Sequence, residues 1–120
     1  MTLITEIFIF LVAVECFYIM YIETFASVQI QSRIFNIPTR ELENENIRTL
    51  FKNQGIYNGL LGLSLIYALF ISSHTKEISI LLLVFIILAA VYGAFTVNKS
   101  ILVKQGLLPA LALIFAIIAL

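Results

Sequence analysis

Tryptophan is absent from this 120-residue chain, and cysteine and histidine occur once each, as Cys16 and His74. A single cysteine excludes a disulfide within the chain and a cysteine-based metal cage, and a single histidine leaves no second imidazole for a metal set. Only 12% of the residues are charged, seven basic against seven acidic, so no bulk charge points to a polyanionic partner. We therefore predict no metal site, no cofactor and no nucleic-acid partner.

Apolar residues, in contrast, make up 62% of the chain, and the mean hydropathy is +1.08. These values are typical of a membrane protein rather than a soluble domain. A helix needs about 20 mostly apolar residues to cross a bilayer. Four segments qualify, and their approximate bounds are 3–25, 56–72, 78–97 and 101–120.

The first of these segments could be mistaken for a signal peptide, but it lacks a basic start and carries Glu6 and Glu15. We interpret it as a retained transmembrane helix. The links after the second and third segments are very short, which makes neighbouring helices antiparallel. The sequence thus predicts an all-α fold, a single domain over residues 1–120, arranged as an up-down-up-down four-helix bundle in the membrane.

The one long hydrophilic segment is the link 26–54. Thr39, directly after Pro38, is in a favourable position for an N-cap, with glutamates following in the first turn. A loose apolar stripe then continues through Leu42, Ile47, Leu50 and Phe51. We predict that this stretch forms a short amphipathic helix at the membrane interface, ending before the second span.

The distribution of lysine and arginine indicates how the chain is oriented. Six of the seven basic residues lie in or next to the first and third links: Arg33, Arg40, Arg48, Lys52, Lys99 and Lys104. Only Lys76 lies in the second link. The positive-inside rule then predicts a multi-pass plasma-membrane protein with both termini outside and the 26–54 link in the cytoplasm.

Two acids interrupt the first span, although an ionisable group at the centre of a bilayer costs about 2.5–3.5 kcal/mol. Glu15 is expected near mid-membrane and Glu23 near the cytoplasmic boundary, roughly 12 Å apart along the helix. Tyr18 lies one turn from Glu15, on the same polar face. The alternatives are a protonated or hydrogen-bonded structural carboxyl at Glu15 and an ordinary interfacial carboxylate at Glu23.

Amides, a phenol and glycines gather where the second span begins. Gln54 and Asn58 share one helix face and Asn53 and Tyr57 another, because residues four apart are neighbours. The other helices contribute polar residues at the same predicted level. The predicted pocket is a polar cluster of ten residues: Glu15, Tyr18, Glu23, Asn53, Gln54, Tyr57, Asn58, Tyr92, Thr96 and Gln105. The alternative is that these side chains are polar only because they lie at an interface and join helices together.

The motifs around these residues are similar to those of a known family. The segments Glu15-x-x-Tyr18, Asn53-Gln54-Gly55-x-Tyr57-Asn58-Gly59, Tyr92-Gly93-x-x-Thr96 and Gln105-Gly106-x-x-Pro109 resemble the family catalogued as domain of unknown function 1304. That resemblance implies a small bacterial four-helix membrane protein, distantly similar to the DoxX-like group, and implies no particular activity. Family members often carry His after the first Glu, whereas Cys16 stands here, so we expect no Glu-His pair.

Three functions fit these observations. The first is a non-enzymatic protein that binds, and transports or senses, a small amphiphile, lipid or ion in a polar pocket in the cytoplasmic half of the bundle. Membrane lipids, and a second copy or another membrane protein, would be its partners. The second is a structural or regulatory subunit acting through a protein partner. The third is a small intramembrane enzyme, an isomerase or reductase, that uses Glu and Tyr for proton transfer.

Overall fold

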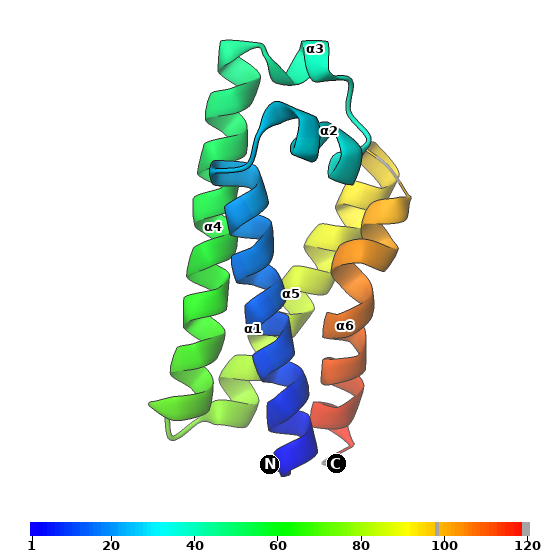
Figure 1. The fold of residues 1–120 in the computed structure, drawn as a ribbon. Coiled ribbons are helices and arrows are strands. Elements are labelled where there is room, and N and C mark those ends of the chain that lie inside the picture. The colour runs from blue at the N-terminus through cyan, green and yellow to red at the C-terminus, as the bar shows by residue number, and fades with distance from the viewer. Residues whose placement is uncertain (98, 119–120) are drawn as a thin grey trace. The chain divides into compact units, whose positions relative to one another are not determined.

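The computed structural model describes residues 1–97 and 99–118, and these residues form an all-helical protein (Figure 1). Within this part of the chain there are six helices: α1 (Leu3–Thr24), α2 (Val28–Phe35), α3 (Thr39–Leu42), α4 (Glu45–Phe70), α5 (Thr75–Thr96) and α6 (Ser100–Ile117). Residue 98 of the predicted third link and residues 119–120 of the predicted last span lie outside the described residues.

Among the described residues, three helices are long and apolar enough to cross a membrane, namely α1, α5 and α6. They match the first, third and fourth predicted spans to within a few residues at each end. Most of the large apolar side chains on these helices are exposed rather than packed, for example Phe10, Leu88 and Ile114. Exposed apolar surface on this scale is compatible with hydrocarbon as the surrounding solvent.

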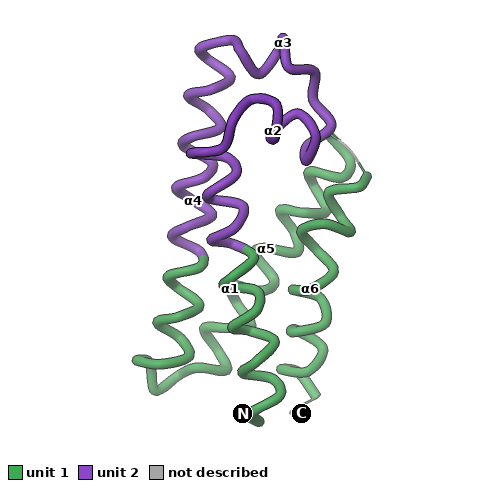
Figure 2. Tube along the Cα trace, in the orientation of Figure 1, with its two compact units in different colours: residues 1–15, 62–120 green, residues 16–61 purple. Residues whose placement is uncertain are grey.

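The chain divides into two compact units (Figure 2). Unit 1 comprises Met1–Glu15 and Gly62–Leu120, and unit 2 comprises Cys16–Leu61. Each boundary falls within a helix, since α1 and α4 both continue from one unit into the other.

In unit 1, α5 packs along α6, and the start of α1 contacts the end of α6. The Thr5 hydroxyl donates to the Phe115 carbonyl at 3.5 Å, and the rings of Phe8 and Phe115 lie 4.7 Å apart. Small residues let the helices approach, with Ala90 on α5 facing Gly106 on α6. The buried core of this unit is therefore made of small and aliphatic side chains on long helices.

In unit 2, two short helices connect the end of α1 to the start of α4. The Ser27 hydroxyl caps α2 by accepting from the Ile30 amide at 3.3 Å. Asn36 ends α2 in the left-handed conformation, with φ 57°, and Pro38 follows two residues later. Helix α2 was absent from the sequence prediction, although Ser27 and Asn36 are ordinary start and stop signals for a helix.

The predicted amphipathic helix from Thr39 to the membrane boundary is wrong in two respects. Pro38, not Thr39, is the N-cap of α3, and α3 ends at Leu42. The remainder of the predicted helix belongs to α4, which runs without a break through Gly55 into the second predicted span. The physical reason is Asn44, whose Oδ1 accepts from the amides of Asn46 at 2.9 Å and Ile47 at 3.3 Å and so begins a new helix.

This cap leads to a testable expectation. Asn44→Ala should lower the free energy of unfolding by about 1 kcal/mol, because the amide groups of the first turn of α4 lose their side-chain acceptor. The measurement is denaturant unfolding in mild detergent, followed by circular dichroism. Asn46→Ala removes an exposed asparagine from the same turn and should be neutral or slightly stabilising. Equal losses for the two variants would contradict the role of Asn44.

Candidate functional site

The close approach of α1 and α4 in unit 2 depends on two glycines. A Cβ added at Gly55 would collide with the Thr24 hydroxyl and lie 3.1 Å from the Met20 carbonyl oxygen. A Cβ at Gly59 would meet the flexible thioether of Met20. Because Gly55 has no side chain, the backbones come close enough for polar groups at the end of α1 to reach α4.

One such group is the Glu23 carboxylate, which is 7% exposed. Asn58 on α4 donates from Nδ2 to Glu23 Oε1 at 2.6 Å and also to the Gln54 carbonyl oxygen at 3.2 Å. A buried carboxylate needs hydrogen-bond donors to offset its lost hydration. The Asn58 amide supplies one of them and holds the orientation of the Glu23 side chain.

A second buried polar side chain, Gln31 of α2, ties that helix to the end of α1. Gln31 is 7% exposed, and its Nε2 donates to the carbonyls of Ile22 at 2.9 Å and Glu23 at 3.3 Å. The last carbonyls of a helix have no amide partner within the helix. Gln31 satisfies two of them, so α2 is held against α1 by hydrogen bonds rather than by apolar packing alone.

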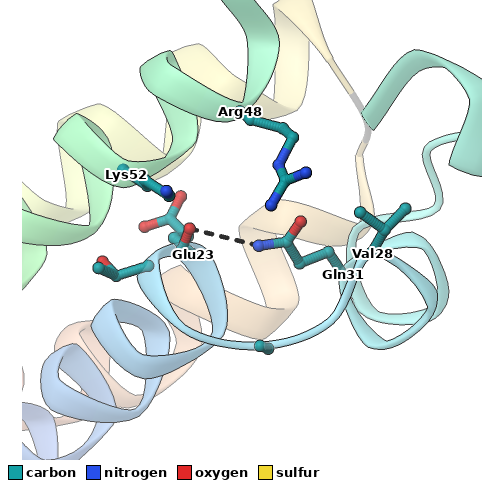
Figure 3. A pocket seen from close by; sticks show the side chains of 7 residues that line it. Glu23, Val28, Gln31, Arg48 and Lys52 are labelled. Carbon is teal, nitrogen blue, oxygen red and sulfur yellow. Dashed lines mark hydrogen bonds between the residues drawn. The ribbon is translucent and has the colours of Figure 1, made fainter. Parts of the chain in front are cut away.

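Around these two side chains lies a small pocket contained wholly in unit 2 (Figure 3). Its lining comprises Glu23, Thr24, Ala26, Val28, Gln31, Arg48 and Lys52. In Figure 3 the guanidinium of Arg48 points toward the side of the pocket where Gln31 lies, and Lys52 extends toward Glu23. Three helices and the α1–α2 turn therefore each contribute to the wall.

The pocket is small, polar and of mixed charge. Its interior has room for about one or two water molecules. Glu23 contributes a carboxylate, while Arg48 and Lys52, one turn apart on α4, contribute two cations. Among the described residues, the buried Thr24 Oγ1 has no hydrogen-bond partner in the protein. Such a site can bind a group that carries both charges. The two cations would bind the negative part of that group, and the carboxylate would bind its positive part.

Of the predicted site residues in unit 2, the structure joins Glu23 and Asn58 by a hydrogen bond. Asn53 and Gln54 have exposed side chains, and Tyr18 and Tyr57 are 55% and 66% exposed. None of these four lines the pocket. The backbone carbonyl of Gln54, rather than its side chain, takes part in the Asn58 contact.

The remaining predicted site residues belong to unit 1. Glu15 is half-buried, and Gln105 is likewise intermediate in exposure. Tyr92 is 70% exposed, and its carbonyl accepts from the Thr96 hydroxyl at 2.9 Å within α5. Their inclusion in one cluster with Glu23 stays a prediction.

Sequence reasoning missed Thr24, Gln31, Arg48 and Lys52 as pocket residues. A usable signal existed for the last two, since residues 48, 52, 55 and 59 are spaced four, three and four apart and so share one face of α4. That face includes the glycines that contact α1. Gln31 gave no such signal, because its partners are backbone carbonyls eight and nine residues away.

Comparison with known proteins supplies the family. The sequence of residues 10–117 matches the family described as "Protein of unknown function (DUF1304)". The chain is 59% identical over 115 residues to "Uncharacterized protein YpaA" of Lactococcus lactis subsp. lactis (strain IL1403), covering 95% of this chain and 97% of that protein. No solved structure matches significantly. The chain therefore belongs to the DUF1304 family of proteins of unknown function.

Proposed function

We propose that this protein is a multi-pass integral membrane protein that binds the polar head of a small membrane amphiphile in the unit 2 pocket. The proposal rests on four side chains that line one hollow. They are the buried carboxylate of Glu23, the buried amide of Gln31 and the cationic groups of Arg48 and Lys52. Buried polar groups are costly unless they are satisfied. A hollow lined by them is therefore suited to a polar ligand.

The composition of unit 2 supports a position for this pocket at the membrane boundary. The apolar run of α1 ends at Thr24, and Arg48 and Lys52 follow on the polar part of α4. Tyr18, Tyr21 and Tyr57 expose their rings, as aromatic residues do at the level of lipid headgroups. In the proposed arrangement, the apolar part of α4 completes a bundle of four spans.

The proposed orientation follows from the basic residues of the 26–54 link, which put the pocket on the cytoplasmic side and both termini outside. Membrane lipids are the proposed ligands because the small interior would hold one polar group of a lipid headgroup, while the apolar tail would lie along the exposed apolar surface of the helices. A protein partner, either a second copy or another membrane protein, remains a prediction.

The test is native mass spectrometry of the protein released from mild detergent. The wild type should retain lipid-sized adducts, and Arg48→Ala/Lys52→Ala should retain about thirtyfold less, since each basic residue contributes about 1 kcal/mol toward the phosphate of a lipid headgroup. Arg33→Ala/Arg40→Ala removes two exposed cations from the same link and should leave retention unchanged. Equal retention by the wild type and both double variants would refute the proposed pocket.

A further inference from the structure

We infer that the ligand of this pocket is a phosphate ester that carries a primary ammonium group, as in the headgroup of phosphatidylethanolamine. This inference rests on the proposed function and names the chemical class of the ligand. The ammonium would enter the hollow beside Glu23, and the phosphate would bind Arg48 and Lys52 at its mouth.

The interior of the pocket favours a hydrogen-bonding cation. Asn58 engages Oε1 of Glu23, and Oε2 of the same carboxylate retains lone pairs that can accept from a ligand. Glu23 and Thr24, adjacent in sequence at the end of α1, both line this hollow, and the open carboxylate oxygen of Glu23 is the acceptor that a ligand ammonium would meet.

The size of the hollow distinguishes among cationic groups. Space for about one or two water molecules accommodates the single nitrogen of a primary ammonium with its hydrogens. The trimethylammonium of choline has three additional carbons and no N–H to donate. A phosphatidylcholine headgroup would therefore be excluded by its size and would leave the acceptor unsatisfied.

The charge of the pocket excludes simpler ligands. A purely anionic group would meet the Glu23 carboxylate, and a purely cationic group would meet Arg48 and Lys52. A group that carries both charges satisfies each side, and the guanidinium of Arg48 can bind two phosphate oxygens at once. The exposed positions of Arg48 and Lys52, on adjacent turns of α4, suit contact with a phosphate at the mouth.

The experiment compares three lipids with identical acyl chains, phosphatidylethanolamine, phosphatidylcholine and phosphatidylglycerol, supplied in equal amounts to the full-length protein in mild detergent. Native mass spectrometry should show that phosphatidylethanolamine is retained about tenfold more than either of the others, as expected for loss of a charge-assisted hydrogen bond. Glu23→Gln should abolish that preference. Glu45→Gln, the same change at an exposed position of α4, should preserve it.

The outcomes separate this inference from the proposed function. Retention of phosphatidylglycerol at or above phosphatidylethanolamine, unaffected by Glu23→Gln yet lost in Arg48→Ala/Lys52→Ala, would overturn the inference and leave the proposed function standing. Retention of all three lipids regardless of every pocket variant would overturn both. Displacement of bound lipid by soluble phosphoethanolamine would support the ligand class with the free ester as a source, and resistance to displacement would support the lipid as the source.

Discussion

Gly55→Ala is expected to lower the free energy of unfolding by about 1–3 kcal/mol, the usual cost of overpacking a filled contact. The added methyl would collide with the Thr24 hydroxyl, which has one short rotatable bond, and lie 3.1 Å from a Met20 backbone oxygen that cannot move independently. The loss is expected even though Gly→Ala inside a helix otherwise stabilises by about 0.8–1 kcal/mol. Chemical unfolding in mild detergent, followed by circular dichroism, measures the difference.

Two other glycines provide matched controls for this substitution. At Gly59 the added methyl meets the flexible end of Met20, so Gly59→Ala should cost less than Gly55→Ala. At Gly106 the nearest atoms, in Ala90 and Leu102, lie at an ordinary contact distance of 3.4 Å, so Gly106→Ala should be neutral or stabilising. If Gly55→Ala proved as well tolerated as Gly106→Ala, the close approach of α1 and α4 would be refuted.

Gln31→Glu should have an effect of similar size, about 2–3 kcal/mol of lost stability. The change removes the amide that donates to the carbonyls of Ile22 and Glu23, and a buried acceptor left without its donor costs about 1–3 kcal/mol. It also brings a carboxyl group to the negative end of α1. Hydrogen exchange of the α2 amides, together with unfolding in detergent, should report both the loss of stability and the release of the helix.

Gln29→Glu is the control, because it makes the same chemical change on the same helix at an exposed position. Its exchange rates and its stability should stay close to those of the wild type. Comparable loosening of α2 in the two variants would mean that charge on the helix, rather than the Gln31 bond to α1, governs its attachment.

The sequence predicted the elements whose formation depends on long apolar runs. Helices α1, α5 and α6 follow from uninterrupted hydrophobic segments of about the required length, so only their ends shifted by a few residues. Helix α4 was harder to delimit because its first half is polar and Gly55 resembles a boundary. The Asn44 cap and the continuous backbone hydrogen bonding of the helix outweigh the low helix propensity of Gly55.

Only part of the pocket could be predicted from the sequence. Glu23 was noticeable because a carboxylate within an apolar run needs an explanation. Its partner Asn58, which does not line the pocket, was noticeable because it is an amide near a predicted helix contact. The exposed amides Asn53 and Gln54 carried the same signal without contributing to the wall. The contribution of Gln31 depends on how the chain turns after Thr24, and composition and periodicity do not determine that turn.

The unbroken course of α4 has a consequence for the thermodynamics of binding. Arg48 and Lys52, which line the pocket, and Asn58, which holds the Glu23 side chain, all belong to one helix rather than to a loop, so their backbone positions are set before a ligand arrives. The entropy lost on binding is then confined largely to the two long basic side chains, about 0.5–1.5 kcal/mol each. A ligand at this site would gain affinity through pre-organisation, with little folding coupled to its association.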